Sequence, residues 1–500
     1  MISQKTSTIG VVELPSLGLF DAKKKNHFSH VNKTFPLVGK QILLSNFQAA
    51  GFDAKLINLK PGDYEEEFGK ITWRGTEYSK VYYGGRIKDI DPLAYDAWGV
   101  TNNFFQYREI AEMTIKHLAS KGKPVVVGGS DAIAGPQFYF AAGATAVVLD
   151  KTGGANASIM DYVLEKKPRE ELSGVILANG NQPPRRVRRP LHPEEWPIPD
   201  VSVIQQCFGT NSDQPQLNVP EELLSVGSII PDIGCDRQCD FCQTPTYRLG
   251  YQAMSPKRVL QWLVAQKEAG ARSVSFYSDQ FLGRILKKGG RDDVLEIMKG
   301  MRELELAVLW LNGLELKKVT MGRGINRKNN TDMTPDDELI SALWGWNGKT
   351  GCYSAYIPAE RPIFGQENYA KLLPWQKHCD IIKAIARTGI PVINYGVMIG
   401  FADDNDESLL RLEEAIARLY EDILTINPLV IFQVFSLTLI PIPGTPQWDI
   451  VGDSGLIRIK DPSILGAMGT TGIDTNYLSY EQVADWQERL AKIGSPYTGF

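Results

Sequence analysis

The alternation of strand-like and helical stretches constrains the fold of this 500-residue chain more than any other feature. In both halves, short runs rich in apolar and β-branched residues are followed by amphipathic helical patterns. Such alternation predicts parallel sheets whose faces are covered by helices. Because one hydrophobic core does not extend over so many residues, we expect two or three domains.

Residues 1–180 predict a doubly wound, Rossmann-like α/β domain. We expect its strands at Thr8–Leu14, Ala54–Leu59, Tyr95–Val100, Pro124–Gly129, Thr145–Leu149 and Val175–Asn179. Helices are expected at Phe105–Ser120 and Asn156–Leu164. Ligands of such sheets bind beyond the carboxyl ends of the strands. The loops expected there are Pro15–Lys33, Thr101–Asn103, Gly128–Ser130 and Asp150–Asn156.

Residues 181–224 predict a proline-rich linker, and residues 225–445 a partial (β/α)6 barrel with its active site at the carboxyl-end mouth. Its strands are expected at Ser228–Ile233, Ser273–Ser278, Ala307–Leu311, Cys352–Ile357, Val392–Ile399 and Val430–Leu439. Its helices are expected at Pro256–Glu268, Asp292–Leu304, Pro335–Trp344, Leu373–Arg387 and Asp406–Leu419. Residues 446–500 predict a C-terminal extension with one helix near Tyr480–Ala491.

Three cysteines, Cys235, Cys239 and Cys242, follow the first expected barrel strand. Their CxxxCxxC spacing supplies three thiolates, one short of the four that complete an iron–sulfur cluster or a structural zinc site. A zinc site would need a fourth Cys or His nearby, and the nearest histidine, His192, lies more than forty residues upstream. A disulfide framework would need an extracellular context, and the chain opens without an apolar signal core. The spacing therefore favours a cluster with one metal position open to a ligand.

Composition limits the partners of the chain. The net charge of −4 argues against general nucleic-acid binding, and we interpret the basic run Arg185–Arg189, which lies among prolines, as a solvated linker. Apolar stretches fall short of the roughly 18 residues of a membrane span. Low cysteine usage without a signal peptide predicts the reducing cytoplasm, which an oxygen-sensitive cluster also needs. The remaining cysteines, Cys207, Cys352 and Cys379, are too widely spaced to predict a second cluster.

The run Gly234–Cys242 resembles the cluster motif of the radical S-adenosylmethionine (SAM) superfamily. The resemblance implies that the three cysteines hold three irons of a 4Fe–4S cluster, whose fourth iron binds SAM. It also implies SAM contacts from Phe241, Asp279, Glu360 and Ile399. Plainer interpretations stay open, with Asp279 as a helix or turn cap, Glu360 as a surface carboxylate and Ile399 as a buried strand residue that offers only its backbone.

Further segments resemble cobalamin-dependent radical SAM enzymes. Pro441–Pro446 is similar to a Pro-x-Pro-Gly-Thr-Pro segment of that family, Tyr95–Thr101 and Pro124–Ser130 to two of its strand ends, and Trp196–Asp200 to the exit of its linker. The resemblance implies a cobalamin-binding domain ahead of the barrel. The implied cobalamin contacts are Thr101, Gly128, Gly129, Ser130 and Gly153.

Two departures weaken the cobalamin assignment. The acidic Gly-Glu-Gly-Glu loop of the family is replaced by Asp150–Gly154, which keeps glycines but changes part of the charge. The histidine that ligates cobalt in some cobalamin enzymes is replaced by Pro36, with His27 and His30 nearby in the same loop. We therefore expect cobalt without a lower ligand from the protein; the alternatives are a degenerate domain or a substrate-binding platform.

These patterns together predict a radical SAM enzyme that methylates an unactivated carbon of a small-molecule substrate, with cobalamin and a low-potential electron donor such as flavodoxin or ferredoxin. A cobalamin-dependent cyclase or rearrangement enzyme, similar to tetrapyrrole cyclases, is the first alternative. Methylthiolation is disfavoured because the extra N-terminal cysteines of those enzymes are absent before Cys207. A non-enzymatic cobalamin- or metal-responsive binding protein is the alternative outside catalysis.

Overall fold

The computed structural model describes residues 6–28, 35–178, 180, 182, 189–209, 219–320, 333–364 and 369–495. The chain forms two compact units. Unit 1 consists of Met1–Cys207, Ile440–Ile450 and Ile459–Ala467, and unit 2 consists of Phe208–Leu439, Val451–Arg458 and Met468–Phe500. No helix of the described residues is long and apolar enough to cross a membrane.

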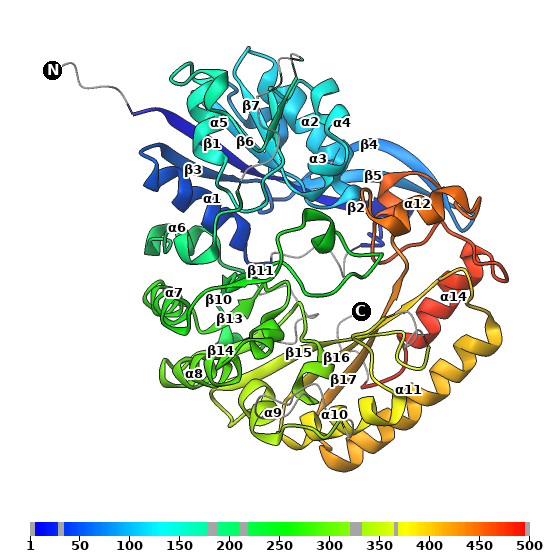
Figure 1. The fold of residues 1–500 in the computed structure, drawn as a ribbon. Helices are drawn as coiled ribbons and strands as arrows, with labels where there is room; N and C mark the ends of the chain where they lie inside the picture. The colour runs from blue at the N-terminus through cyan, green and yellow to red at the C-terminus, as the bar shows by residue number, and fades with distance from the viewer. Residues whose placement is uncertain are drawn as a thin grey trace. The chain divides into compact units, whose positions relative to one another are not determined.

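A six-stranded sheet in the order β3-β1-β6-β7-β8-β9 forms the centre of unit 1 (Figure 1). The strands are β1 (Thr8–Glu13), β3 (Asp53–Asn58), β6 (Ala97–Thr101), β7 (Val125–Gly128), β8 (Ala146–Val148) and β9 (Val175–Leu177). All neighbours pair in parallel except β8 and β9. The helices are α1 (Val38–Ala49), α2 (Arg108–Ala119), α3 (Ser130–Ala134), α4 (Pro136–Ala141), α5 (Asn156–Val163) and α6 (Val201–Gln206). The predicted doubly wound α/β fold is confirmed.

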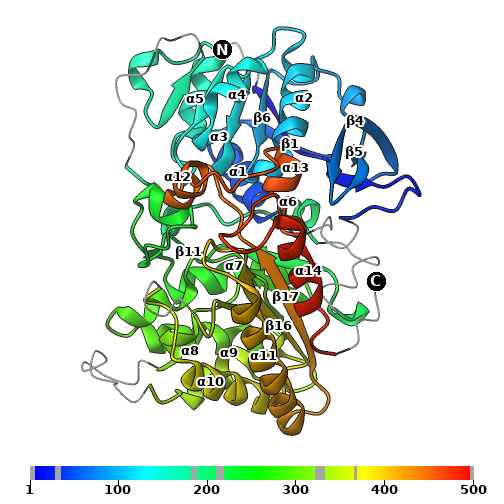
Figure 2. The same ribbon diagram turned by 90° about the vertical axis from the view of Figure 1, so that its right-hand side faces the viewer.

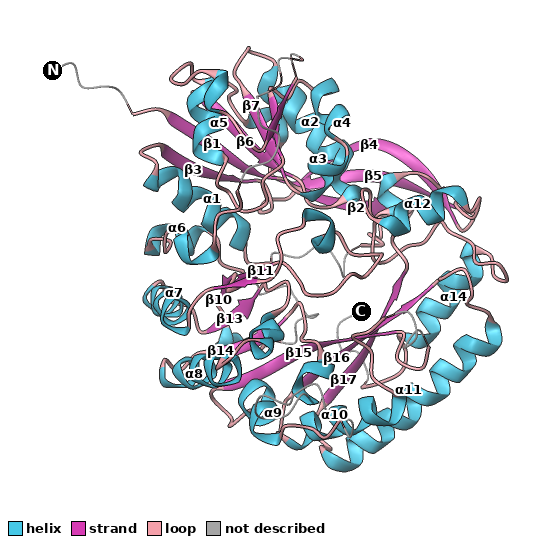
Figure 3. Cartoon of the chain, in the orientation of Figure 1, coloured by secondary structure: helices cyan, strands magenta, loops and turns pink. Residues whose placement is uncertain are grey.

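Unit 1 also contains a three-stranded antiparallel sheet, in the order β2-β5-β4, that the sequence patterns did not predict (Figure 3). Its strands are β2 (Ser16–Phe20), β4 (Tyr64–Trp73) and β5 (Thr76–Gly84). The prediction that Pro15–Lys33 is entirely loop is therefore wrong. The tight turn between β4 and β5 uses Arg74 and Gly75, both with positive φ, as two-residue hairpins require. β4 carries three consecutive glutamates near its start, Glu65–Glu67, and also Lys70, which hides the strand from a search for apolar runs.

The chain returns to unit 1 after the last strand of unit 2. The Pro-Gly-Thr-Pro turn lies against α3, because a Cβ on Gly444 would lie 3.3 Å from the Ala134 Cβ. It leads into α12 (Pro446–Asp453), where Trp448 packs edge-on against Phe105 with ring centroids 5.6 Å apart. In α13 (Pro462–Leu465), the cap residue Asp461 binds the buried Lys80 ammonium of β5 at 2.9 Å.

Unit 2 is built on six parallel strands that follow one another in chain order, which is the arrangement of an open, partial barrel (Figure 1). The last two of them, β16 and β17, lie side by side in Figure 2. The strands are β10 (Val226–Ile229), β13 (Ser273–Phe276), β14 (Ala307–Trp310), β15 (Gly351–Glu360), β16 (Val392–Ile399) and β17 (Ile431–Thr438). The helices are α7 (Pro256–Glu268), α8 (Gly290–Glu303), α9 (Asp337–Trp344), α10 (Trp375–Arg387), α11 (Asp406–Ile426) and α14 (Tyr480–Leu490).

Local signals explain the helix starts in unit 2. The Ser255 hydroxyl caps α7 by accepting from the Arg258 N–H, and Pro256 follows at the first helical position. Asn405 and Ser408 form a reciprocal capping box at the start of α11. Side chains of alternate strand residues point toward the helices, as Tyr395 does when it meets His378 of α10 at 2.7 Å.

Candidate functional site

The three cysteines lie on one loop that leaves the first strand of the parallel sheet. After β10 the chain forms the short strand β11 (Asp232–Ile233), which pairs antiparallel with β12 (Gln252–Ala253). Residues 234–251 between them are the cysteine loop. Gly234 opens it with φ +76°, and a Cβ there would lie 1.6 Å from the Gly250 carbonyl oxygen, so the base of the loop can close only on glycine.

All three thiols of the cysteine loop are free and partly exposed. Burial raises the pKa of the Cys239 thiol to about 11, against the opposing effect of the Lys371 ammonium. Within the described ranges, no three His, Cys, Asp or Glu side chains converge on a site for a single metal ion. A 4Fe–4S cluster does not need several side chains to meet at one metal ion, because each cysteine binds a separate iron. Three free thiols on one loop fit such a cluster.

Asp279, which follows β13, holds the base of the cysteine loop. Its Oδ2 accepts the Gly234 N–H at 2.7 Å, and its Oδ1 accepts the Thr244 hydroxyl at 3.4 Å. The strands are parallel, so the segments after β10 and β13 leave the sheet at the same edge. The carboxylate thus positions the loop, and a contact from Asp279 to SAM stays a prediction.

Phe241 belongs to an aromatic and charged group beside the thiols. Its ring meets Tyr369 edge-on at 5.4 Å, and the Lys371 ammonium lies 5.3 Å from its centroid. The Tyr369 hydroxyl donates to Asp240 at 3.1 Å. The segment from Tyr369 to Lys371 is therefore tied to the loop at both Asp240 and Phe241.

Glu360 ends β15 in an unusual conformation. It has φ +58°, in the left-handed region that a glutamate rarely adopts, and it is only 8% exposed. Its Oε1 accepts from Lys371, while its Oε2 has no hydrogen-bond partner among the described residues. Burial raises the pKa of this carboxyl, and Lys371 opposes the rise. A strained, buried carboxylate with one unused oxygen is typical of a functional site.

Ile399 ends β16 and is fully buried. Its carbonyl accepts the Leu439 N–H at 2.8 Å, so the backbone is already engaged there. The next residues, Gly400 and Phe401, donate their N–H groups to Asp404. A backbone contact from Ile399 to SAM stays a prediction.

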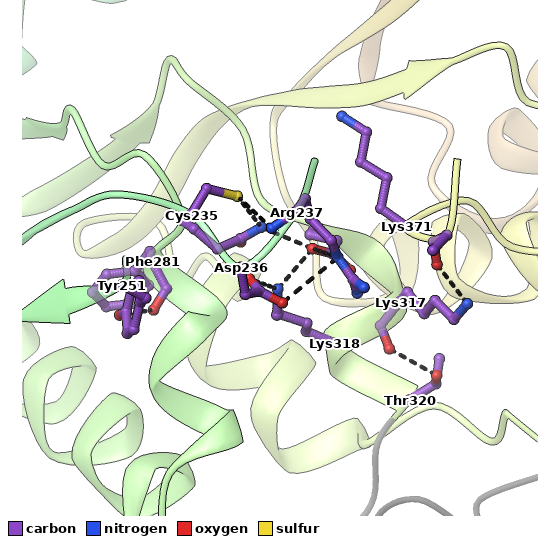
Figure 4. A network of polar contacts seen from close by, with 12 residues as sticks. Cys235, Asp236, Arg237, Tyr251, Phe281, Lys317, Lys318, Thr320 and Lys371 are labelled. Carbon is purple, nitrogen blue, oxygen red and sulfur yellow. Dashed lines mark hydrogen bonds and ion pairs between the residues drawn. The ribbon is translucent and has the colours of Figure 1, made fainter. Parts of the chain in front are cut away.

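Beneath the cysteine loop lies a buried ionic network that sequence patterns did not predict (Figure 4). Glu315, after β14, accepts from the Arg237 Nε at 3.1 Å and from the Lys318 Nζ at 2.8 Å. Lys318, whose side chain is 0% exposed, also binds Asp236 at 2.7 Å. Two acids and two bases thus balance one another. The network joins two distant segments, since 78 residues separate Arg237 from Glu315 and 82 separate Asp236 from Lys318, so only the fold brings them together.

The corresponding edge of unit 1 is occupied by a buried lysine. Lys40 of α1 is 3% exposed, and its ammonium donates to the Thr101 hydroxyl and, at 2.9 Å, to the Val12 carbonyl oxygen. It also pairs with Glu13 at 3.2 Å. We call Glu13, Lys40 and Thr101 the lysine triad. Thr101 lies opposite Gly128 in the β6–β7 register, as the strand-end prediction requires.

The glycine and serine after β7 have partners within the chain. Gly129 has φ +104°, and a Cβ there would lie 2.2 Å from the Asn102 carbonyl oxygen, so the backbone itself demands glycine. The Ser130 hydroxyl accepts from Lys151 at 2.8 Å, and the Ser130 N–H donates to Asn103 at 3.0 Å. This group of an alcohol, an amide and an ammonium suits a ligand rich in amide and phosphate oxygens.

Beside the Asp150–Asn156 loop lies one unsatisfied donor, which comes from α1. Gly153 has φ +83°, and a Cβ there would lie 3.0 Å from the Asn46 Nδ2. That buried amide nitrogen has no hydrogen-bond partner among the described residues. The linker is anchored to the same loop, since the Trp196 indole N–H donates to the Thr152 carbonyl oxygen at 2.9 Å. The residues present fit a cobalamin-type ligand at this edge.

Of the two loop histidines, His27 lies within the described residues. His27 packs against Trp73 and Tyr78, with ring centroids 4.9 and 6.0 Å away. His30 lies outside the described residues, as does most of the basic run Arg185–Arg189.

Comparison with solved structures relates both units to enzymes. OxsB, a cobalamin-dependent S-adenosylmethionine radical enzyme with aqua-cobalamin and S-adenosylmethionine bound, has a TM-score of 0.65 and 14% identity. The alignment covers 97% of this chain and 66% of OxsB, so the chain spans slightly less than two thirds of that protein. The chain has the fold of cobalamin-dependent radical SAM enzymes.

A second structure supports the same fold. The radical S-adenosylmethionine methyltransferase TsrM from Kitasatospora setae, with cobalamin and a [4Fe-4S] cluster bound, has a TM-score of 0.58 and 12% identity over 90% of this chain and 75% of TsrM. Another TsrM structure, with tryptophan substrate and a SAM analog bound, matches 97% of this chain and 89% of TsrM, with the same TM-score and identity. No family model and no curated protein sequence matches the chain.

Proposed function

We propose that this chain is a radical SAM enzyme, in which the cysteine loop holds a 4Fe–4S cluster and Glu360 helps to position SAM. The observation that carries the proposal is that three free thiols and a strained, buried carboxylate lie at one edge of a parallel sheet, linked through Lys371. When bound, the cluster would supply a low-potential electron and one open iron position for the amino acid part of SAM.

The side chains around the loop have separate tasks in this proposal. Cys235, Cys239 and Cys242 ligate the iron, and Asp279 holds the loop base through Gly234. Lys371 binds the Glu360 Oε1 and opposes the rise in the Glu360 pKa that burial causes, which leaves the Oε2 to accept a hydroxyl of the SAM ribose. The rings of Phe241 and Tyr369 exclude water on one side of the thiols and give adenine an apolar surface.

The finer part of the proposal is methyl transfer to an unactivated carbon of a small-molecule substrate. Its support is the shared fold with OxsB and TsrM, together with the polar group at Ser130 and the unsatisfied donor at Asn46. When bound, cobalamin would supply the methyl group. A flavodoxin or a ferredoxin would supply electrons.

Anaerobic reconstitution with iron and sulfide, followed by dithionite, cobalamin and SAM labelled in its methyl group, tests both parts. We expect 5′-deoxyadenosine from the cluster reaction, and label in the product once a substrate is supplied. Loaded protein that forms no 5′-deoxyadenosine and transfers no label would overturn the proposal. 5′-Deoxyadenosine without label transfer would instead favour cyclisation or rearrangement.

A further inference from the structure

The sulfur of Cys235 accepts two hydrogen bonds in addition to its proposed role as an iron ligand. The Arg237 backbone N–H donates to the Cys235 Sγ at 3.4 Å, and the Gln280 side-chain Nε2 donates at 3.8 Å. The first donor is part of the cysteine loop. The second comes from the segment after β13, so the fold and not the motif places it there.

Gln280 is fixed at both ends. Its backbone N–H donates to the fully buried Asp232 at 3.1 Å, and its side-chain Nε2 also donates to the Glu315 Oε2 at 2.8 Å. The residue is 8% exposed. Two acceptors, Cys235 and Glu315, therefore take the two hydrogens of one amide nitrogen. The hydrogen bond to Glu315 thus orients the Gln280 amide before a cluster is bound.

The ionic network in turn fixes Glu315. Arg237 and Lys318 hold the Glu315 carboxylate, and Lys318 also reaches Asp236 (Figure 4). Since Asp236 and Glu315 balance Arg237 and Lys318, the network adds no net charge beside the thiols. Its effect on a bound cluster would come from the direction of the donated hydrogen bond.

Hydrogen bonds to cluster sulfurs change the reduction potential of the iron. An N–H donor stabilises the more negative, reduced cluster and so raises the potential. We propose that Gln280, aimed by Glu315, is a positioning residue that raises the reduction potential of the cluster by donating to Cys235. The inference rests on the proposed function, because it needs a cluster on the cysteine loop.

The test is an electron paramagnetic resonance redox titration of the reconstituted full-length protein. Gln280→Met keeps the length of the side chain and removes the donor. We expect its equilibrium constant for one-electron reduction to fall about tenfold, which corresponds to about 59 mV toward negative potential, with iron content and unfolding temperature unchanged. Gln376→Met is the matched control, because Gln376 is exposed and donates to Asp380 of the same helix, α10.

A second variant separates tuning from a purely structural role. Gln280→Asn keeps the amide but is one methylene too short to reach Cys235, so its potential should match that of Gln280→Met. Potentials equal to wild type in loaded variants would refute the inference. Failure of both variants to load a cluster would refute it too, because Gln280 would then serve assembly. If wild type itself binds no cluster, the proposed function fails instead.

Discussion

The two candidate cofactor regions differ in how their polar groups are satisfied. At the cysteine loop, Glu360 keeps a buried oxygen without a partner and adopts a left-handed backbone. At the edge of the first sheet, the lysine triad satisfies its own charges, and Gly129 is required by contact with Asn102. Strain and unused polar atoms are costly unless a ligand uses them.

This difference shows that the residues themselves support the cluster assignment, whereas the cobalamin assignment depends on the fold. In unit 2, the free thiols and the carboxylate oxygen of Glu360 that has no partner among the described residues indicate ligands even without any relative. Among the described residues of unit 1, the buried side-chain atom without a hydrogen-bond partner is the Asn46 Nδ2, which lies beside Gly153. The cobalamin proposal therefore rests more on the fold shared with OxsB and TsrM. We therefore expect substitutions at the cysteine loop to change cofactor binding more than substitutions at the edge of the first sheet.

The largest expected effect is loss of the cluster. Replacing Cys235, Cys239 and Cys242 together with alanine removes every thiolate of the loop, so iron and sulfide content after reconstitution should fall to background. Cys352→Ala is the control, because that thiol is fully buried in β15. Iron retained by the triple variant at the wild-type level would contradict the assignment. Cobalamin uptake should be unaffected, since it depends on unit 1.

Much of the fold was predictable from the sequence, and the network around the cysteine loop was not. The bounds of β16 and α7 follow directly from apolar pattern and capping residues, which act over a few positions. The β2-β5-β4 sheet escaped because charged residues interrupt β4 and β5, and because β2 has only five residues. Lys318 and Lys371 escaped because their contacts with the cysteine loop join segments far apart in the sequence, which no local pattern encodes.

The next effect concerns stability in unit 1. Lys40→Met leaves the carboxylate of Glu13 without its cation and removes the two hydrogen bonds that the ammonium donates, so the free energy of unfolding should fall by about 3 kcal/mol. A urea titration followed by circular dichroism measures it. Lys55→Met is the control, because its pair with Asp53 is about half exposed. An unchanged free energy of unfolding would show that Lys40 and Glu13 do not form a buried ion pair in solution. Adding Glu13→Gln should recover part of the loss.

A smaller effect is expected at Glu360, on binding and not on assembly. Glu360→Gln keeps the shape and the bond from Lys371 but removes the charge, and hydrogen bonds to charged groups contribute about 1.5–3 kcal/mol. SAM affinity should fall roughly 10- to 100-fold, since about 1.4 kcal/mol is one factor of ten. Anaerobic calorimetry on cluster-loaded protein measures the SAM affinity. Glu338→Gln is the control, because the Glu338 carboxylate pairs with Arg291. Equal affinities would remove Glu360 from the site.

The smallest effect is expected at Ser130. This residue tests whether side chains of unit 1 bind a ligand directly, as we propose for the cysteine loop. Ser130 and Lys151 already satisfy each other, so a corrin would have to replace or extend that bond. A single neutral hydrogen bond contributes about 0.5–1.5 kcal/mol, and Ser130→Ala should therefore weaken cobalamin retention only a few-fold, measured by corrin absorbance after dialysis. Ser158→Ala is the control, because that hydroxyl bonds within α5. If Ser130→Ala retains as much corrin as the control, the polar group after β7 serves only the fold. A loss above tenfold would mean that the edge of unit 1 binds its ligand through side chains as directly as the cysteine loop does.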